Sequence, residues 1–445
     1  MSELDLHGLP LTTDSADAAA AYRKGIELYS AAWAGAGRAI DEAIAHDPDF
    51  ALPCAAKAIF LSNMLDHAGA RSQVSRAAAL VAKNGAPREK SHVNVIRLMI
   101  EGPKPDVIPA ALAHAEEWPR DAFILSFLLG AFGLLAFSGM ADHDQACVDL
   151  CERHAPKYGD DWWFLTYKGW ADAENGSNAV GRRQLERALE LRRENGAASH
   201  SYAHAMFEDG SNDEAEAFLN DWLPIYHTAS PLYSHVVWHT AWLALDRGDI
   251  DRAFEIYHSI LRPALKKGMP AVVVSDAASF LWRARAYGQD VPPGLWNEVA
   301  EVGATSFPKG GFPFIDMHMA FISGATGDLD DYIGRAADHE RLIASHELPG
   351  GRMAPEVCRG MISFGKGDYE AAARILESIA GDVVRLGGSG AQRSIVEDTL
   401  LIALMKSGNL DKAASLLDRR METRPSPRNR RWRSDLAGGG GRHSI

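Results

Sequence analysis

Hydrophobic and polar residues follow a helical period along most of this chain. From about residue 14 onward, apolar residues recur at steps of three and four. That spacing gathers the apolar side chains on one face of an α-helix, whereas a half-buried strand needs strict alternation. Alternating runs of β-branched residues are almost absent. The pattern therefore predicts an all-α protein with a strand content near zero.

The second half of the chain repeats one kind of turn. Each copy has a glycine that ends one helix in a left-handed conformation, followed by an Asp or Asn that caps the next helix. Neighbouring copies lie about 40 residues apart, with one copy skipped, which is the spacing of stacked helical hairpins. We therefore expect a tetratricopeptide-like α-α superhelix, a solenoid of about ten hairpins. The copies are DGSNDEAEAFL at 209, RGDIDRAFEIY at 247, TGDLDDYIGRA at 326, KGDYEAAARIL at 366 and SGNLDKAASLL at 407.

This repeat divides the chain into three parts. Residues 1–13 precede the first helical pattern and are predicted to be an N-terminal extension, and residues 14–422 carry the solenoid. Residues 423–445 include RPSPRNRRWRSDLAGGGGRHSI, which offers no apolar face to bury. A segment of that composition is typical of a flexible basic tail.

Composition narrows the class of partners and the compartment. A formal net charge of −13 argues against nonspecific nucleic-acid binding, because an acidic surface repels phosphate. Four scattered cysteines and an acidic N-terminus without an apolar signal segment favour a cytoplasmic protein. Residues 122–141 form an uncharged run long enough to span a bilayer, but glycines interrupt it and basic flanks are lacking. We interpret it as a helix buried on all sides, and we expect no membrane partner.

Two pairs of histidines carry the main candidate chemistry. His200 and His204 form one pair, and His235 and His239 form the other. A spacing of four residues puts both rings of a pair on one helix face, which is how helices bind metal ions through imidazole. Glu208 lies one turn beyond His204 on the same face and is a further candidate ligand. If the two helices line a common inner surface, the pattern predicts a divalent metal site, such as a Zn²⁺ site.

The segment IDMHMAF supplies a second candidate function for the same pocket. Asp316 either binds the metal or orients one of its histidine ligands. Without a metal, Asp316 holds the tautomer of an imidazole that acts as general base, and His318 acts as the acid. The catalytic candidates are therefore Asp316 and His318. The alternative is that each histidine is a hydrogen-bonded core residue.

The segment VVRLGGSGAQRSI contains candidate substrate-binding residues. Ser389, Gln392 and Arg393 lie where a glycine-rich turn enters a helix, and a helix N-terminus together with arginine binds anionic or amide groups. The equally balanced alternative is an interhelical turn whose Arg393 pairs with a structural carboxylate. The spacing of a P-loop is absent.

With these motifs in hand, the chain resembles the tetratricopeptide repeat protein 38 family over most of its length. The resemblance implies the repeat fold and a cytosolic setting, and it implies no established reaction. Both histidine pairs and the candidates in the last two motifs fall on family positions, and His92 matches as well. The chain departs from the family pattern at Cys54, Leu129 and Gly130. The shared motifs are GLPLTT at 8, AIAHDPDF at 43, REKSHV at 88, YKGW at 167, IDMHMAF at 315 and VVRLGGSGAQRSI at 383.

Two functions of different classes remain open from the sequence. The first is a metal-assisted or histidine-dependent hydrolase or lyase that acts on a small polar metabolite in a closed inner pocket. The second is a non-catalytic scaffold that binds a peptide or protein partner in an open concave groove, as helical repeat arrays do. An enzyme should close around histidines with shifted pKa values, whereas a scaffold should keep its groove open. A homodimer is compatible with either function.

Overall fold

The computed structural model describes residues 3–102 and 104–437, and nearly all of its regular structure is helical. Within those residues there is no strand, only an isolated antiparallel bridge between Leu4 and Pro10. The first half contains α1 (Ala16–Ser30), α2 (Ala36–His46), α3 (Ala51–Asn63), α4 (His67–Asn84), α5 (Pro87–Glu101), α6 (Lys104–Glu117), α7 (Ala122–Leu128), α8 (His143–Tyr158), α9 (Trp162–Glu174), α10 (Asn178–Leu191), α11 (Gly196–Glu208) and α12 (Asn212–Trp222). The second half contains α13 (Tyr233–Arg247), α14 (Ile250–Ile256), α15 (Arg262–Ala264), α16 (Pro270–Ala286), α17 (Pro293–Ser306), α18 (Pro313–Thr326), α19 (Asp330–Ala344), α20 (Met353–Gly365), α21 (Tyr369–Ile379), α22 (Gly390–Lys406), α23 (Leu410–Thr423) and α24 (Pro427–Ala437). The predicted all-α class is confirmed.

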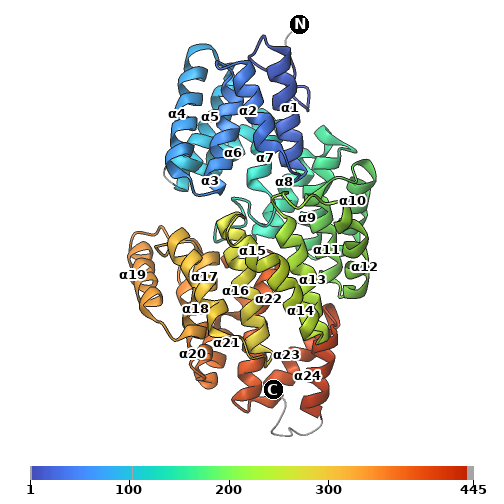
Figure 1. Cartoon of the computed structure of the whole chain (residues 1–445), viewed down its shortest axis with the longest axis vertical. Helices are drawn as coiled ribbons and strands as arrows, with labels where there is room; N and C mark the ends of the chain where they lie inside the picture. Colours follow the sequence, from blue (N-terminus) through green and yellow to red (C-terminus); the bar gives the residue numbers. More distant parts are fainter. Residues whose placement is uncertain (1–2, 103, 438–445) are drawn as a thin grey trace.

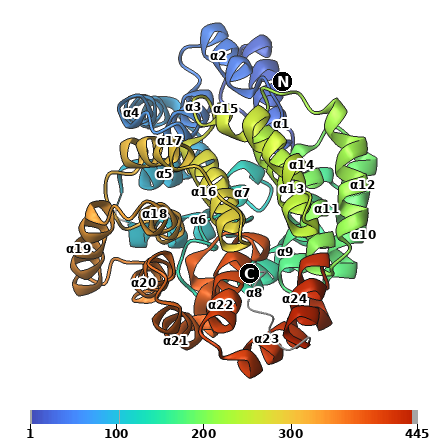
Figure 2. The same cartoon turned by 60° about the horizontal axis from the view of Figure 1, so that its bottom comes forward.

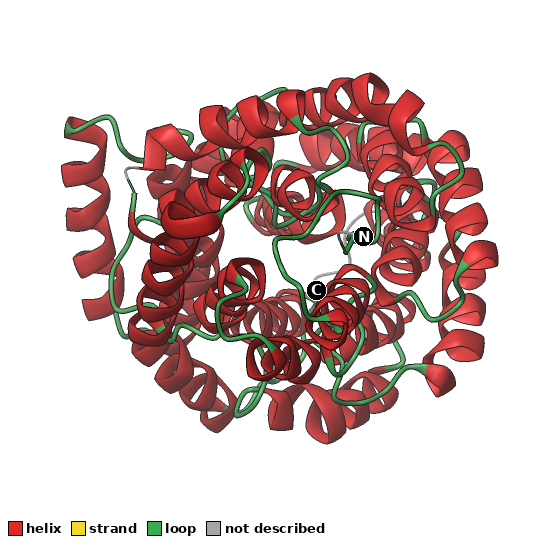
Figure 3. Cartoon of the chain, turned by 90° about the horizontal axis from the view of Figure 1, so that it is seen from above, coloured by secondary structure: helices red, strands yellow, loops and turns green. Residues whose placement is uncertain are grey.

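Consecutive helices pack in pairs, and the pairs stack into a coil. Helices α1 and α2, α3 and α4, α9 and α10, and α20 and α21 are among the closest partners. Alternate helices also touch, as α9 does with α11, α16 with α18, and α18 with α20. Seen from above, the helices wind around a common centre (Figure 3), and the chain descends from the N-terminal helices to the C-terminal ones (Figure 1). This is the tetratricopeptide-like superhelix that the repeat spacing predicts.

The predicted turn pattern is present at the five repeated segments. The glycines of these turns, at positions 210, 248, 327, 367 and 408, all have a positive φ between 77° and 85°. A side chain is strained in that conformation, so glycine is the residue that lets one helix end and the next begin. Asp249 and Asp368 cap the helices that follow by accepting a hydrogen bond from a backbone N–H three residues on.

The uncharged run at 122–141 differs from its prediction. Only Ala122–Leu128 forms a helix, and all seven of its residues are buried. The backbone then turns at Gly130, where φ is +84°, and continues without a regular helix to residue 142. The single long buried helix predicted here is therefore wrong, because glycines break it after two turns. In the part of the chain that the structure describes, no helix is long and apolar enough to cross a membrane.

The C-terminal segment also differs from its prediction. Residues 427–437 form α24, which packs against α13 and α23, and its Trp432 is 5% exposed. Arg431 donates hydrogen bonds to the backbone oxygens of Asp246 and Arg247 at the end of α13. A flexible tail is therefore wrong for these residues, since the arginines find carbonyl acceptors at a helix C-terminus. The rest of the predicted tail, 438–445, lies outside the described residues.

The last helices close the coil against its middle. Helix α22 packs on α11 and α16, and α24 packs on α13. Figure 2, with the lower end brought forward, shows α22 and α24 on the same side of the coil as α11 and α13. Segments that are far apart in the sequence therefore enclose the region around α11 and α13, where the candidate site lies.

Candidate metal centre

Two helices of neighbouring hairpins position the histidine pairs. Asn195 caps the start of α11, where its side chain accepts a hydrogen bond from the Ala198 N–H, and Gly248 caps the end of α13 in a left-handed conformation. Both helices are apolar on several sides, so the polar rings lie inside the fold. His204, His235 and His239 are 1%, 3% and 0% exposed, and His200 is half-buried.

The four imidazoles converge, as the spacing predicts. We call His200, His204, His235 and His239 the His tetrad. The Nε2 atoms of His200 and His235 are 3.0 Å apart, and those of His204 and His239 are 3.2 Å apart. One ring nitrogen from each residue lies within 4.8 Å of the others. In a tetrahedral Zn²⁺ site with imidazole nitrogens about 2.0–2.1 Å from the metal, ligand nitrogens are about 3.3–3.4 Å apart. The His tetrad is therefore close to the size of a four-histidine metal site.

Carboxylates lie behind the rings, on the side away from the tetrad centre. The Nδ1 atom of His235 is 2.8 Å from Oδ1 of Asp276 on α16, and the Nδ1 atom of His204 is 3.8 Å from Oε1 of Glu174 on α9. A carboxylate on the outer nitrogen fixes the tautomer of a ligand histidine and leaves the inner nitrogen free to bind a metal. The first contact is a hydrogen bond, and the second is longer than one. The sequence reasoning missed both residues, although an aspartate inside the apolar run AVVVSDAASF was a signal of a buried partner.

The environment keeps three of these rings neutral. Burial, with the neighbouring imidazoles, holds the pKa values of His200, His204 and His239 well below the usual value for histidine. Aromatic rings surround them: Trp170 stacks on His200, and Trp238 stacks on His235. A neutral imidazole has a lone pair on its unprotonated nitrogen, which is the form that binds a metal ion.

The structure does not bring Glu208 to the His tetrad. Its carboxylate makes an ion pair with Arg424, which precedes α24. Glu208 is the last residue of α11, and its side chain lies toward the C-terminal helices instead of the rings. An arginine from the other end of the sequence therefore pairs with the carboxylate that was predicted as a metal ligand.

Asp316 and His318 are separated from the His tetrad and from each other. Asp316 accepts hydrogen bonds from Arg335 and His339 on α19, at 2.9 Å each. The Nδ1 atom of His318 is 2.7 Å from the backbone oxygen of Phe314, and burial lowers its pKa to about 4. Asp316 was predicted to hold an imidazole of the pocket while His318 acts as the acid; the imidazole that it contacts is that of His339, which is not part of the His tetrad. Residues two apart, such as Asp316 and His318, project to different sides of a helix.

Ser389, Gln392 and Arg393 have structural partners. Ser389 and Gln392 form a capping box that begins α22: the Ser389 hydroxyl accepts from the Gln392 N–H, and the Gln392 side chain accepts from the Ser389 N–H. Arg393 lies 3.5 Å from Asp144 and 3.7 Å from Glu174. These contacts match the alternative that the sequence left open, in which the turn is structural and Arg393 pairs with a carboxylate. The link to Glu174 nevertheless connects this turn to the edge of the His tetrad.

A second group of buried ionisable residues lies in the N-terminal half. His92 and His114 both approach Oδ2 of Asp121, at 3.0 and 3.3 Å, and we call these three residues the His–Asp cluster. Arg88 donates a hydrogen bond of 2.8 Å to the same oxygen. Of this cluster, sequence reasoning singled out only His92, through the family resemblance, since the spacing of the three residues follows no helical repeat.

Fold and site together define an all-α repeat protein of the tetratricopeptide type with a buried His tetrad. No family model matches the chain. Among solved structures, it is similar to yeast Tom70, with 12% identity, 95% of each chain covered and a TM-score of 0.33. It is also similar to Naa15/Naa10 bound to HypK-THB, with 14% identity, 94% of this chain and 65% of that chain covered, and a TM-score of 0.22. For the P58(IPK) TPR domain the identity is 12%, the coverage 89% and 100%, and the TM-score 0.20. The helical pairs described above, and not these low scores, carry the assignment of the fold.

Proposed function

We propose that this protein binds one divalent metal ion, most simply Zn²⁺, in the His tetrad. The observation that carries the proposal is the pairing of inner Nε2 atoms at 3.0 and 3.2 Å with carboxylates behind two of the rings. Without an ion, each Nε2 pair can share only one N–H···N hydrogen bond, whereas a metal ion would accept the lone pairs of both rings. The buried Nδ1 atoms of His204 and His239 have no hydrogen-bond partner in the described part of the chain. A metal at the Nε2 side would place the proton of His204 on Nδ1, which lies 3.8 Å from Oε1 of Glu174.

We propose further that the metal centre serves hydrolysis of a small polar substrate. When bound, Zn²⁺ supplies Lewis-acid chemistry and lowers the pKa of water at the site. His200 is the half-buried member of the His tetrad and therefore lies on the side from which a substrate arrives. The other three histidines are enough to hold the ion, as in catalytic zinc sites with three protein ligands. A lyase reaction would use the same centre.

The structure gives less support to the alternative of a peptide-binding scaffold. Such a scaffold needs an open inner surface along the repeats. Here α22 covers parts of α11 and α16, and α24 covers part of α13. The surfaces next to the His tetrad are therefore occupied by the chain's own helices. We also propose membership in the tetratricopeptide repeat protein 38 family, on the motifs given in the sequence analysis. The two histidine pairs, which also fall on family positions, meet in the His tetrad.

Metal analysis tests the first part of the proposal. Protein purified without a His tag or chelator should contain close to one equivalent of zinc, iron or manganese by elemental analysis. The double variant His204→Ala, His239→Ala should lose that metal while circular dichroism shows its helices retained. The control variant His46→Ala, His67→Ala removes two exposed histidines and should keep the metal. Equal metal content in both variants, or no uptake when zinc is added to the wild type, contradicts the proposal.

A substrate screen tests the second part separately. Small amides, esters and lactones should include a compound whose hydrolysis stops when a chelator is added and resumes with zinc. Activity that survives in the double variant would show that the His tetrad is not the catalytic centre. Stoichiometric metal without hydrolysis of any compound would retain the metal site and remove the hydrolase.

A further inference from the structure

The carboxylate of Glu174 lies between the His tetrad and the start of α22. Glu174 is the last residue of α9, and its side chain is 3% exposed. Its Oε2 atom accepts a hydrogen bond of 2.7 Å from the backbone N–H of Gly390, the first residue of α22. Its Oε1 atom is 3.8 Å from Nδ1 of His204. One side chain therefore joins a proposed metal ligand to a helix that begins 216 residues further along the chain.

The segment 387–393, which we call the α22 turn, offers this carboxylate positive charge. Its capping box leaves the backbone N–H of Gly390 for Glu174, and the first N–H groups of a helix carry partial positive charge. Arg393 adds a full charge, because its Nη2 atom is 3.7 Å from Oε2 of Glu174. A carboxylate that is almost completely buried needs such partners. The α22 turn therefore holds the Glu174 side chain in place.

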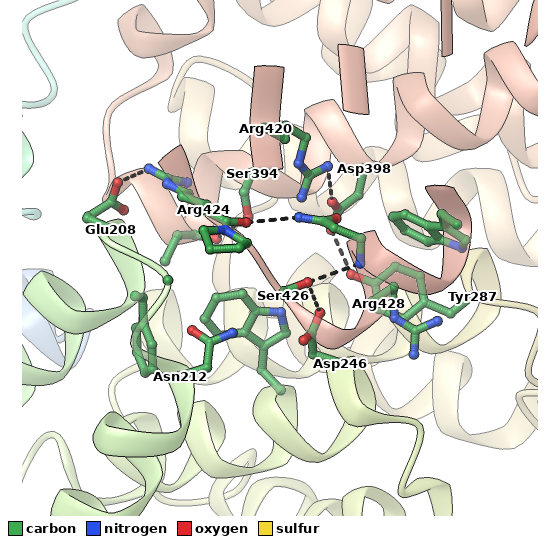
Figure 4. A pocket seen from close by; sticks show the side chains of 17 residues that line it. Glu208, Asn212, Asp246, Tyr287, Ser394, Asp398, Arg420, Arg424, Ser426 and Arg428 are labelled. Atoms are coloured by element: carbon green, nitrogen blue, oxygen red, sulfur yellow. Dashed lines mark hydrogen bonds and ion pairs between the residues drawn. The ribbon is translucent and has the colours of Figure 1, made fainter. Parts of the chain in front are cut away.

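A second carboxylate lies on the other side of Gly390. Glu208, the last residue of α11, makes an ion pair with Arg424 at one edge of a small cavity between α11 and the C-terminal helices (Figure 4). A Cβ atom added at Gly390 would lie 2.6 Å from Oε1 of Glu208 and 2.7 Å from Nη2 of Arg424, so the α22 turn packs directly on this pair. The start of α22 is thus held between the ends of α9 and α11. Of the two carboxylates, Glu174 is the one that approaches a ring of the His tetrad.

Two facing atoms along this path lack hydrogen-bond partners among the described residues. They are Oε1 of Glu174 and Nδ1 of His204, and both are buried. Buried polar atoms are nearly always paired in folded proteins. At 3.8 Å the two atoms are just beyond hydrogen-bond distance. A metal ion on Nε2 fixes the proton of a ligand imidazole on Nδ1, so metal binding gives Glu174 the donor that completes this contact.

We propose, on the basis of the metal site proposed above, that the α22 turn is a positioning element of the metal centre. Arg393 and the Gly390 N–H hold Glu174, and Glu174 orients His204 through the Nδ1 atom of its ring. Arg393 is therefore a positioning residue and not a ligand. Because coupling between two sites is reciprocal, metal binding in turn stabilises the docking of the α22 turn on α9. Closure of the coil by α22 and binding of the metal thus strengthen each other.

The zinc affinity of the full-length protein, measured by competition with a chelator, tests the role of Arg393. Arg393→Gln should lower the affinity about tenfold, because the loss of an outer partner typically costs about 10–100-fold. Arg393→Lys keeps a positive charge next to Glu174 and should retain part of that affinity. Arg187→Gln removes an exposed arginine that pairs with Asp160, and it should leave the affinity unchanged. Equal affinity of Arg393→Gln and wild type overturns the positioning role and leaves the metal centre intact, whereas a wild type that takes up no zinc contradicts both.

A double-mutant cycle separates positioning from a general effect on the fold. If Arg393 acts through Glu174, Arg393→Gln should lower the zinc affinity less than about twofold in protein that already carries Glu174→Gln. Glu208→Gln makes the same change at the end of α11, on the other side of Gly390. In that background Arg393→Gln should still cost about tenfold. Circular dichroism shows that each variant is folded. A full tenfold loss in the Glu174→Gln background overturns the path through Glu174.

Hydrogen exchange measures the reciprocal effect. Zinc should slow amide exchange in residues 387–393 of the wild type about tenfold, the same factor by which the α22 turn strengthens zinc binding. The turn between α20 and α21, residues 366–368, is the internal control and should exchange at the same rate with and without zinc. Protection of the α22 turn should disappear in Glu174→Gln. Equal protection in Glu174→Gln and wild type, or no protection in wild-type protein that has bound zinc, contradicts the coupling.

Discussion

The His tetrad and the His–Asp cluster use the same kinds of residues, but their charges are arranged in opposite order. In the His tetrad, imidazole nitrogens face one another and the carboxylates of Glu174 and Asp276 lie behind them. In the His–Asp cluster, the carboxylate of Asp121 lies in the middle, and nitrogens from His92, His114 and Arg88 surround it. The first arrangement presents lone pairs to a cation, and the second presents donors to an anion that is already there.

The pKa of Asp121 reflects the arrangement of charges in the His–Asp cluster. Burial alone would oppose ionisation of Asp121, but the interactions with His92, His114 and Arg88 hold its pKa well below the usual range. A metal ion added there would meet the guanidinium group of Arg88, 2.8 Å from the same carboxylate oxygen. The repulsion between two buried cations at such a distance is large. The three side chains of the His–Asp cluster can each offer a ligand atom, yet Arg88 already supplies the positive charge.

The comparison teaches that a group of ligand-type residues is judged by its surroundings. The two clusters differ in the residue next to them. The carboxylates beside the His tetrad come from α9 and α16, whereas Arg88 lies on α5, four residues before His92. Substitutions of these neighbouring charged residues therefore distinguish the two clusters experimentally better than substitutions of the histidines do.

The largest effect is expected from Asp121→Asn in the His–Asp cluster. The substitution leaves Arg88 buried without its carboxylate, and removing one partner of a buried ion pair costs about 3–5 kcal/mol. Urea unfolding of the metal-free protein measures the loss. Asp41→Asn breaks an exposed pair with Lys57 and should cost less than about 1 kcal/mol. Equal costs for the two variants would show that Asp121 does not hold Arg88, and a loss of bound zinc in Asp121→Asn would remove the contrast with the His tetrad.

The features of the fold and of the site that depend on nearby residues could be predicted from the sequence. Helical period and turn glycines depend on neighbours within a few residues, and so does the placing of His200 and His204, or of His235 and His239, on one face. The repeat then brings equivalent faces together. Convergence of the four rings could therefore be predicted. An error of one residue in the helix register would have rotated a histidine pair by about 100° about the helix axis.

The remaining features depend on contacts that no local pattern contains. Glu208 continues the face of His204, but its partner Arg424 is 216 residues away. Asp276 reaches His235 from another hairpin, 41 residues along. The basic C-terminal segment has no apolar stripe, yet Arg431 finds the carbonyl end of α13. Long-range ion pairs and helix-end contacts of this kind are set by tertiary packing, so they become visible only in the folded chain.

Asp276→Asn should weaken the metal centre and leave the His–Asp cluster unchanged. The carboxylate of Asp276 orients His235 through its Nδ1 atom, and loss of such an outer partner typically costs about 10–100-fold in metal affinity. Competition with a zinc chelator measures the affinity. Asp251→Asn, on the surface, is the control. Unchanged affinity in Asp276→Asn would mean that His235 does not bind the ion, and the proposed four-histidine set would then be incorrect.

The smallest effect is expected from lowering the pH from 7 to 6, which should change the zinc affinity of the His tetrad only slightly. Three histidines with the usual pKa of about 6.5 would lose zinc affinity about thirtyfold between pH 7 and pH 6, because protons compete for their nitrogens. In the His tetrad, burial holds the pKa values of His200, His204 and His239 well below that value, so these rings remain neutral over this interval. We expect the affinity of wild-type protein to fall by no more than about threefold, the loss that a single histidine of usual pKa gives, after correction for the chelator's own pH dependence. The metal-free fold responds differently: its unfolded state takes up protons below about pH 6.5 while the folded rings do not, so its stability falls as the pH drops through that value. A thirtyfold loss of affinity over the same interval would show that the rings are solvated, and the closed metal centre would then have to be replaced by an open one.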